Sequence, residues 1–141
     1  MFHPRKKETA YWKKYGLKKS FTCLYAGRIS REKNVEHLIE SFLGMTLDEE
    51  SLVESNLALC GDGPLLSELR NKYAQHKTIC FTGCLESEEL AVVYASSDVF
   101  VFPSTTDTFG NVVLEAQACG LPAIVTHMGA RPRLSCITDR V

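Results

Sequence analysis

Residues 96–127 read SSDVFVFPSTTDTFGNVVLEAQACGLPAIVTH. This stretch begins with a short apolar run at Val99–Phe102, crosses a polar loop and continues into a helical pattern over Asn111–Cys119. Gly120 follows the helix, as glycine commonly does at a helix end, and a second apolar run lies at Ala123–Thr126. A strand, a helix and another strand in this order form one βαβ unit of a parallel sheet.

The same alternation runs through the preceding residues. Strand-like apolar runs occur at Phe21–Tyr25, Asn56–Cys60 and Thr78–Thr82. Helical spacing lies between them, in three sets: Val35, Leu38, Ile39, Phe42 and Leu43; Leu65, Leu69 and Tyr73; Leu90, Val93 and Tyr94. We expect Asn34 and Ser87 to cap the first and third of these helices. The pattern predicts a doubly wound α/β fold: a Rossmann-like parallel sheet of about five strands with helices on both faces.

Three segments are expected along the chain. Residues 1–20 are a basic linker, residues 21–127 form the folded domain, and residues 128–141 are an irregular or truncated tail in which we expect no sixth strand. No apolar run approaches the roughly 18 residues that a membrane span needs. No secretory signal is visible at the start, so the default expectation is a cytoplasmic protein.

Charge is distributed unevenly. Residues 1–20 carry seven Lys or Arg and one acidic residue, whereas residues 21–141 carry nine basic and sixteen acidic residues. The favoured interpretation is a solvated linker. The alternative is contact with an anionic acceptor or an anionic membrane surface, which would make the whole protein peripherally membrane-associated. We expect no nucleic-acid partner, because the folded part is acidic and has no basic stripe.

The six cysteines suggest buried, reduced thiols and no metal site. They are Cys23, Cys60, Cys80, Cys84, Cys119 and Cys136. No pair has the two-residue spacing of a metal knuckle or a redox motif, and three of them fall in apolar runs, where cysteine behaves as a small hydrophobe.

The loop after the first strand could bind an anion. It combines Gly27, Arg28 and Lys33 at the entry to a helix. Backbone N–H groups and the positive end of the helix dipole favour an anion there, and the two cations suit a diphosphate. A solvated turn is the alternative. The spacing does not match the Gly-x-Gly-x-x-Gly dinucleotide fingerprint.

Glycines also follow the second strand. Gly61 and Gly63 flank Asp62, and Pro64 comes next. Glycine lets the backbone turn sharply or approach a ligand closely. An ordinary strand-to-helix turn with Pro64 in the first helical turn is favoured on spacing alone.

The loop before Asn111–Cys119 holds the richest set of polar groups. The amides of Phe109, Gly110 and Asn111 would be among the unpaired donors of a helix N-terminus. Asp107 precedes them and Glu115 follows just inside the helix. Both carboxylates could accept hydrogen bonds from ligand hydroxyls, although a loop cap and a solvated helix residue are equally plausible roles.

Together these segments resemble the C-terminal domain of the family 4 (group 1) retaining glycosyltransferases, which have a two-Rossmann-domain (GT-B) architecture. The resemblance covers roughly residues 20–127. It is carried by five motifs in order: Gly27–Asn34, Gly61–Pro64, Phe81–Gly83, Ser97–Ser104 and Phe109–Ala116, with Cys119–Pro122 after the last.

The resemblance implies a role for each site residue. Arg28 and Lys33 would hold the diphosphate of a UDP- or GDP-sugar donor, and Glu115 the nucleotide ribose. Asp107 would contact the donor sugar, and the amides of Phe109, Gly110 and Asn111 would contact phosphate or sugar. Backbone near Cys84 and Leu85 would meet the base, with Gly27 and Gly61 beside the ligand.

The resemblance also implies the function. We expect the donor-binding half of a retaining glycosyltransferase, without a metal or other cofactor. The acceptor-binding N-terminal domain of such enzymes is not represented in the sequence, so we expect donor binding without transfer. Two alternatives remain: an epimerase or phosphorylase of the same architecture, and a non-catalytic nucleotide-sugar-binding module.

Overall fold

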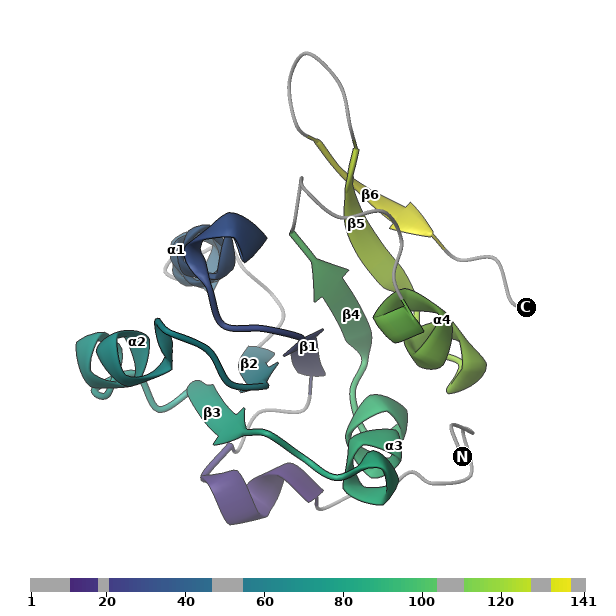
Figure 1. The fold of residues 1–141 in the computed structure, drawn as a ribbon, viewed down its shortest axis with the longest axis horizontal. Coiled ribbons are helices and arrows are strands. Elements are labelled where there is room, and N and C mark those ends of the chain that lie inside the picture. The colour runs from purple at the N-terminus through teal and green to yellow at the C-terminus, as the bar shows by residue number, and fades with distance from the viewer. Residues whose placement is uncertain (1–10, 18–20, 47–54, 104–110, 128–132, 138–141) are drawn as a thin grey trace.

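The computed structural model describes residues 11–17, 21–46, 55–103, 111–127 and 133–137 (Figure 1). Its elements, in chain order, are the 3-10 helix η2 (Tyr11–Tyr15), β1 (Phe21–Ala26), the 3-10 helix η3 (Arg31–Lys33), α1 (Val35–Thr46), β2 (Ser55–Cys60), α2 (Leu66–Lys72), β3 (Ile79–Gly83), α3 (Ser87–Ala95), β4 (Val99–Phe102), α4 (Asn111–Ala118), β5 (Ala123–His127) and β6 (Arg133–Ile137).

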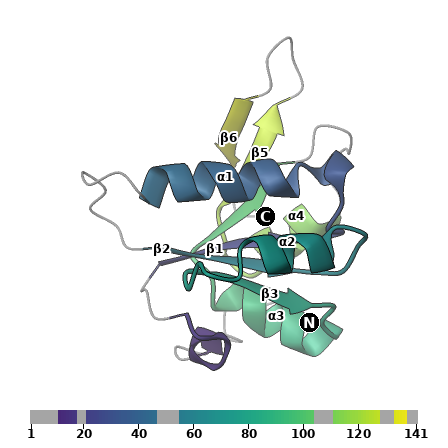
Figure 2. The ribbon, with the colours of Figure 1, turned by 90° about the vertical axis from the view of Figure 1, so that its left-hand side faces the viewer.

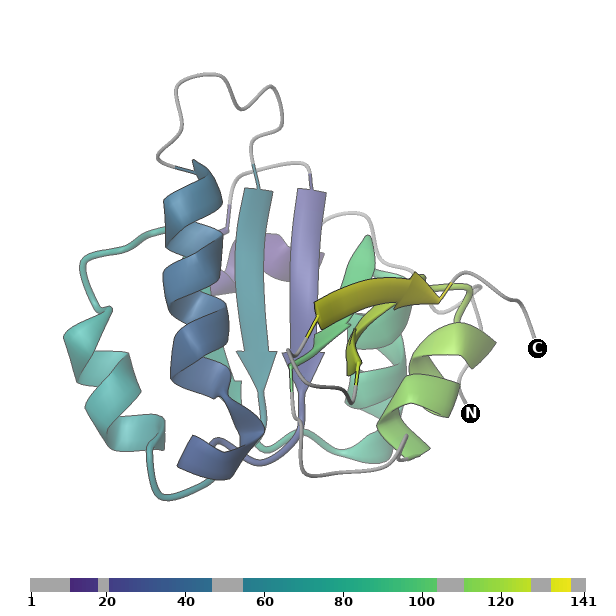
Figure 3. The same ribbon diagram turned by 90° about the horizontal axis from the view of Figure 1, so that it is seen from above.

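The sheet has the order β3-β2-β1-β4-β5-β6. Strands β1 to β5 pair in parallel, which confirms the predicted doubly wound α/β fold. Figure 3 shows β1 and β2 side by side and pointing the same way, with Phe21 opposite Ser55 and Ala26 opposite Cys60. The strand order reverses between β1 and β4, and the carboxyl ends of the parallel strands share one edge.

A sixth strand corrects the prediction for the C-terminal segment. Strand β6 pairs antiparallel with β5, from Ala123 opposite Ile137 to His127 opposite Arg133. We expected no strand in residues 128–141, because the segment has no long periodic pattern. The strand has only five residues and, at the edge of the sheet, pairs on one side only. No long alternating pattern therefore marks it in the sequence.

Two hydrophobic cores lie on opposite faces of the sheet. Alternate β1 side chains point to opposite faces, so Leu24 and Ala26 belong to one core and Cys23 and Tyr25 to the other. Helices α1 and α2 cover the Tyr25 face, and α3, α4 and η2 cover the Leu24 face. Figure 2 shows α1 above the sheet and α3 below it.

Residues 11–17 pack against the domain, unlike the solvated linker expected for the basic segment. Tyr11, Trp12 and Leu17 are buried in the core that α3 covers. Tyr11 Oη donates to Glu89 Oε1 over 2.8 Å, and Trp12 Nε1 donates to the Ser96 carbonyl over 3.1 Å. The aromatic side chains therefore dock on α3, while Lys13 and Lys14 stay exposed.

Of the two predicted helix caps, Asn34 lies at the predicted position and Ser87 lies one residue inside its helix. Asn34 directly precedes α1, and its carbonyl accepts the Leu38 amide, but its φ is 57° and its side-chain Nδ2 donates to the Pro103 carbonyl at the end of β4. Ser87 is the first residue of α3, and Glu86 occupies the cap position without a side-chain capping bond.

Within the described ranges, no helix has the length and apolar character that a bilayer span requires.

Candidate functional site

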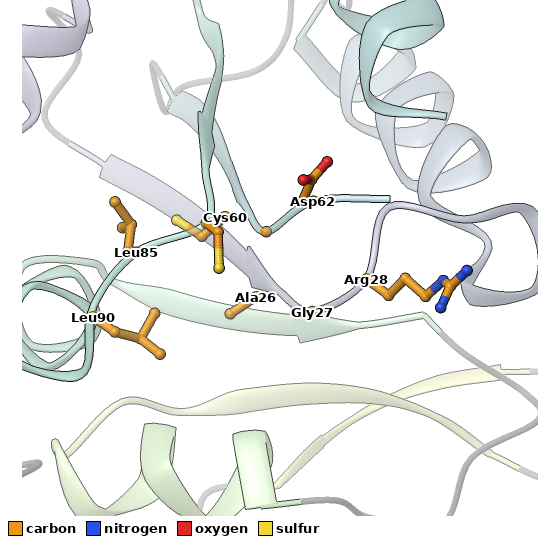
Figure 4. Close-up of a pocket in the computed structure, with 9 residues that line it drawn as sticks. Ala26, Gly27, Arg28, Cys60, Asp62, Leu85 and Leu90 are labelled. Carbon is orange, nitrogen blue, oxygen red and sulfur yellow. The ribbon is translucent and has the colours of Figure 1, made fainter. Parts of the chain in front are cut away.

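A pocket of about 340 Å³ opens at the carboxyl edge of the parallel strands (Figure 4). Three strand ends and one helix contribute its lining, which consists of Ala26, Gly27, Arg28, Cys60, Gly61, Asp62, Cys84, Leu85 and Leu90. Five of these residues, Gly27, Arg28, Gly61, Cys84 and Leu85, are ones that the sequence predicts for ligand binding. They converge because parallel strands end at the same edge, where ligands bind in open α/β sheets.

Backbone hydrogen bonds lock the loops after β1 and β2 together. The Gly27 amide donates to the Cys60 carbonyl over 3.0 Å, and the Ile29 amide donates to the Asp62 carbonyl over 3.0 Å. In return, the Leu65 amide donates to the Ile29 carbonyl over 3.1 Å. The floor of the pocket therefore extends the sheet beyond its regular strands and is fixed before any ligand arrives.

The glycines after β2 are explained by this contact between loops. Gly61 has a φ of 138°, and a Cβ there would collide with the Gly27 carbonyl oxygen. A Cβ on Gly63 would likewise collide with the Ile29 carbonyl. Both positions need glycine because another loop's backbone occupies the space. Pro64 precedes α2 by two residues, so it lies in the turn and not in the helix.

Arg28 forms the polar end of the pocket. Tyr25 Oη donates to the Arg28 carbonyl over 2.7 Å, which fixes the backbone from which the side chain extends. The side chain is exposed, and no described residue holds its guanidinium through a hydrogen bond or ion pair. Figure 4 shows Arg28 on the side of the pocket opposite Leu85 and Leu90. Lys33 lies at the end of η3, outside the lining, and is half-buried.

The opposite end of the pocket is apolar. Leu85 and Leu90 are half-buried there, beside Ala26 and Cys60. Burial raises the pKa of the Cys60 thiol to about 12, so it remains a neutral hydrophobe at physiological pH. This end suits a flat apolar group, and the Arg28 end suits an anion.

The cysteines divide into buried and exposed thiols. Cys23, Cys60, Cys80 and Cys119 are buried and free, as the sequence predicts. Cys84 is exposed at the pocket, which differs from that prediction, because the strand ends one residue earlier at Gly83. The side chain of Cys136 lies outside the described residues. In the described part of the chain, no three His, Cys, Asp or Glu side chains gather as metal ligands do.

Glu115 lies on α4 and is not part of the lining of the pocket. It is half-buried, and its Oε2 accepts a hydrogen bond from Tyr94 Oη over 3.2 Å. Asn111 begins α4, where only its backbone is described. Asp107, Phe109 and Gly110 lie outside the described residues, so their predicted roles remain predictions.

Sequence reasoning missed several residues of the site. Asp62 follows β2 directly and lines the pocket, with its Oδ1 accepting the Gly63 amide over 2.7 Å. Its place between two glycines after a strand was a usable signal. Leu90 reaches the pocket from α3, and Tyr94 reaches Glu115 from the same helix. Both were assigned only to the core-facing side of a helix.

Fold and pocket together define an α/β domain of the Rossmann-like class with a ligand pocket at the carboxyl edge of its sheet. The chain belongs to the glycosyl transferases of group 1, because the sequence model of that family matches residues 7–136. The match covers most of the chain.

Curated relatives are similar to the chain over most of its length. A sulfoquinovosyl transferase of Arabidopsis thaliana is 39% identical over 109 residues, covering 77% of this chain and 20% of the relative. A GDP-mannose-dependent alpha-mannosyltransferase of Corynebacterium glutamicum is 38% identical over 133 residues, covering 91% of this chain and 29% of the relative. The chain spans between 20% and 33% of the length of the curated relatives that it matches.

Solved structures share the fold. The C-terminal domain of a glycosyl transferase group 1 family protein of Francisella tularensis has a TM-score of 0.72 at 24% identity, covering 88% of this chain and 67% of that one. A pneumococcal O-GlcNAc transferase in complex with UDP and GlcNAc has a TM-score of 0.67 at 27% identity, covering 80% of this chain and 22% of that one. These neighbours confirm the predicted GT-B type of fold.

Proposed function

We propose that this chain is the nucleotide-sugar-binding half of a retaining glycosyltransferase, with the pocket at the carboxyl ends of β1, β2 and β3 as its donor site. The observation that carries the proposal is the polarity of this pocket. It joins an apolar end at Leu85 and Leu90 to an exposed guanidinium at Arg28. A nucleoside diphosphate has the matching polarity, with a flat base at one end and two anionic phosphates at the other.

In this proposal the base lies between Leu85 and Leu90, beside the backbone of Cys84. Arg28 binds the diphosphate, since a guanidinium offers a fork of donors that matches phosphate oxygens. Lys33 adds a second positive charge from η3. The locked loops support the proposal, because groups that are ordered before binding cost less conformational entropy when the ligand arrives.

Family resemblance supplies the remaining roles. Glu115 would bind the ribose and Asp107 the donor sugar, and the amides of Phe109, Gly110 and Asn111 would contact phosphate or sugar. During transfer, the bond between the anomeric carbon and the diphosphate oxygen would break, the acceptor would bond to that carbon, and negative charge would develop on the departing phosphate. Arg28, Lys33 and the α4 amides would stabilise that charge, the kind of preorganised electrostatics that is often the largest catalytic contribution. Metal-independence is part of the proposal, as is a UDP- or GDP-sugar donor.

Calorimetric titration of the chain with UDP, GDP and the free nucleosides tests the proposal. We expect one diphosphate to bind, far more tightly than its nucleoside, and its affinity to be unchanged in EDTA. A tenfold or greater loss of affinity on chelation would contradict the assignment of phosphate binding to Arg28 and Lys33.

Labelling of the exposed thiol of Cys84 tests where the nucleotide binds. Its modification by iodoacetamide, followed by mass spectrometry of the peptide that contains it, should slow when the bound diphosphate is present. Buried Cys119 is the control, because its labelling reports any opening of the fold as a whole. It should react slowly with and without the nucleotide. Equal Cys84 labelling with and without saturating nucleotide would place the binding site elsewhere.

A further inference from the structure

Tyr94 connects the wall of the pocket to α4. It lies four residues after Leu90 in α3, on the same side of that helix, and its side chain is fully buried. The ring packs against Phe100, with the two ring centroids 5.8 Å apart. Its Oη donates to Glu115 Oε2 over 3.2 Å. A buried hydroxyl on the helix that carries Leu90 therefore holds a half-exposed carboxylate on the neighbouring helix.

The surroundings of this hydroxyl fix its chemical state. Burial, followed by the adjacent Glu115 carboxylate, raises the pKa of Tyr94 far above its ordinary value. The phenol is therefore neutral at physiological pH and available as a hydrogen-bond donor. Tyr94 belongs to the same buried core as Cys60, and Cys60 lines the pocket.

We infer that Tyr94 is a positioning residue that holds one oxygen of Glu115 so that the other accepts a hydroxyl from the ribose of the bound nucleotide. The inference rests on the proposed function and extends it to a residue that would not itself touch the ligand. An unrestrained glutamate loses rotamer entropy when a ligand orders it. The bond from Tyr94 restricts Glu115 before the ligand binds, which lowers that cost at the moment of binding.

The test compares nucleotides with and without ribose hydroxyls. Wild type, Tyr94→Phe and Glu115→Gln are titrated with UDP and GDP, and with their 2′,3′-dideoxy forms. Tyr94→Phe keeps the ring and removes only the hydroxyl. We expect it to weaken the affinity for the ribose nucleotide about threefold to tenfold, as for one lost hydrogen bond. The affinity for the dideoxy nucleotide should stay unchanged. Glu115→Gln should show a larger loss with the same dependence on the ligand hydroxyls.

Tyr73→Phe is the matched control, since Tyr73 is a buried tyrosine in the core on the opposite face of the sheet. This variant also removes one tyrosine hydroxyl, and it should change neither affinity. In a Glu115→Gln background, Tyr94→Phe should cause no further loss of affinity, because the carboxylate that it positions is gone.

The outcomes separate the two claims. Suppose that Glu115→Gln weakens binding of the ribose nucleotide but not of the dideoxy nucleotide. If Tyr94→Phe then weakens binding of both nucleotides equally, or of neither, the positioning role is wrong and the proposed function stands. If wild type binds neither diphosphate, the donor site is wrong and the inference falls with it. If wild type binds but Glu115→Gln does not discriminate, the ribose role of Glu115 and the inference are both overturned.

Discussion

The carbonyl oxygen of Gly27 occupies the space that a side chain on Gly61 would need. The two residues lie on different loops, and the Gly27 amide donates to Cys60, the residue before Gly61. The contact brings the ends of β1 and β2 together at the floor of the pocket. Glycine at position 61 is therefore a requirement of packing between loops as well as of its φ of 138°.

Gly61→Ala should destabilise the protein and disturb the pocket. The added Cβ meets rigid backbone, and the φ of residue 61 is one that alanine adopts only under strain, so we expect a loss of more than about 1 kcal/mol in the free energy of unfolding. Urea denaturation followed by circular dichroism measures it. The control is Gly44→Ala, because Gly44 lies in α1 with open space around its Cβ position. That change should be neutral or stabilise by up to about 1 kcal/mol. Equal effects of the two substitutions would contradict the loop contact.

Trp12→Ala should cost about 3–5 kcal/mol of unfolding free energy, as large-to-small changes of buried aromatic residues do. Trp12 is 7% exposed and is bonded to the Ser96 carbonyl. It is the only tryptophan, so unfolding should be followed by circular dichroism. The neighbouring Lys13→Ala replaces an exposed side chain and should stay within about 0.5 kcal/mol of wild type. A Trp12→Ala variant as stable as Lys13→Ala would mean that residues 11–17 are a solvated linker after all.

Stability should decline as pH rises above about 9. Burial raises the pKa of Cys60 to about 12, of Cys80 to about 12 and of Cys23 to about 11, from a reference value of 9.0. Below pH 9 these thiols are protonated in both states. Above it, the unfolded chain releases protons that the folded chain retains, so unfolding becomes more favourable by up to about 1.4 kcal/mol per pH unit for each group.

Unfolding free energies at pH 7.5, 9 and 10 check this effect. A Cys60→Ala variant will be less stable at every pH because of the cavity, but its stability should fall less steeply between pH 9 and 10. Tyr25 and Tyr94, whose pKa values burial also raises, add a loss of the same sign at higher pH. A flat wild-type profile up to pH 10 would contradict the buried thiols.

Most of the sheet could be predicted because strands of a parallel sheet are buried on both faces and read as continuous apolar runs. Val99–Phe102 is such a run, and all four residues are buried. The docking of Trp12 could not be found this way, since the surrounding lysines dominate the composition and a single turn of 3-10 helix has no measurable period. Strand β6 was missed for a similar reason: it is short and paired on one side only.

For the site, the loop after the first strand indicated Gly27 and Arg28, and the family resemblance added Gly61 and Cys84. These residues converge because each lies within two residues of the end of a parallel strand. What the sequence could not predict was contact between elements far apart in the chain. The reason for glycine at position 61 lies in a loop 34 residues earlier, at Gly27. Likewise, the bond from Tyr94 to Glu115 depends on how α3 packs against α4, which local sequence does not specify.

The charge of Arg28 and Lys33 carries the central claim that the pocket binds a nucleoside diphosphate. Replacing both by alanine should weaken diphosphate binding at least tenfold, the scale of one lost charged hydrogen bond, and leave nucleoside binding nearly unchanged. The salt dependence of diphosphate affinity should flatten, because exposed charges are screened over about 8 Å at physiological ionic strength. Arg28→Lys should restore only part of the affinity, since it keeps the charge but loses the fork.

The deciding measurement is calorimetric titration of the Arg28→Ala, Lys33→Ala variant with UDP and GDP at two salt concentrations, beside wild type and a control. Arg31→Ala is that control, since it removes an exposed arginine from the same loop without touching the pocket lining. We predict a tenfold or greater loss for the double variant at low salt, a small change for the control, and similar melting temperatures for all three proteins. Unchanged diphosphate affinity in a folded double variant would contradict the account.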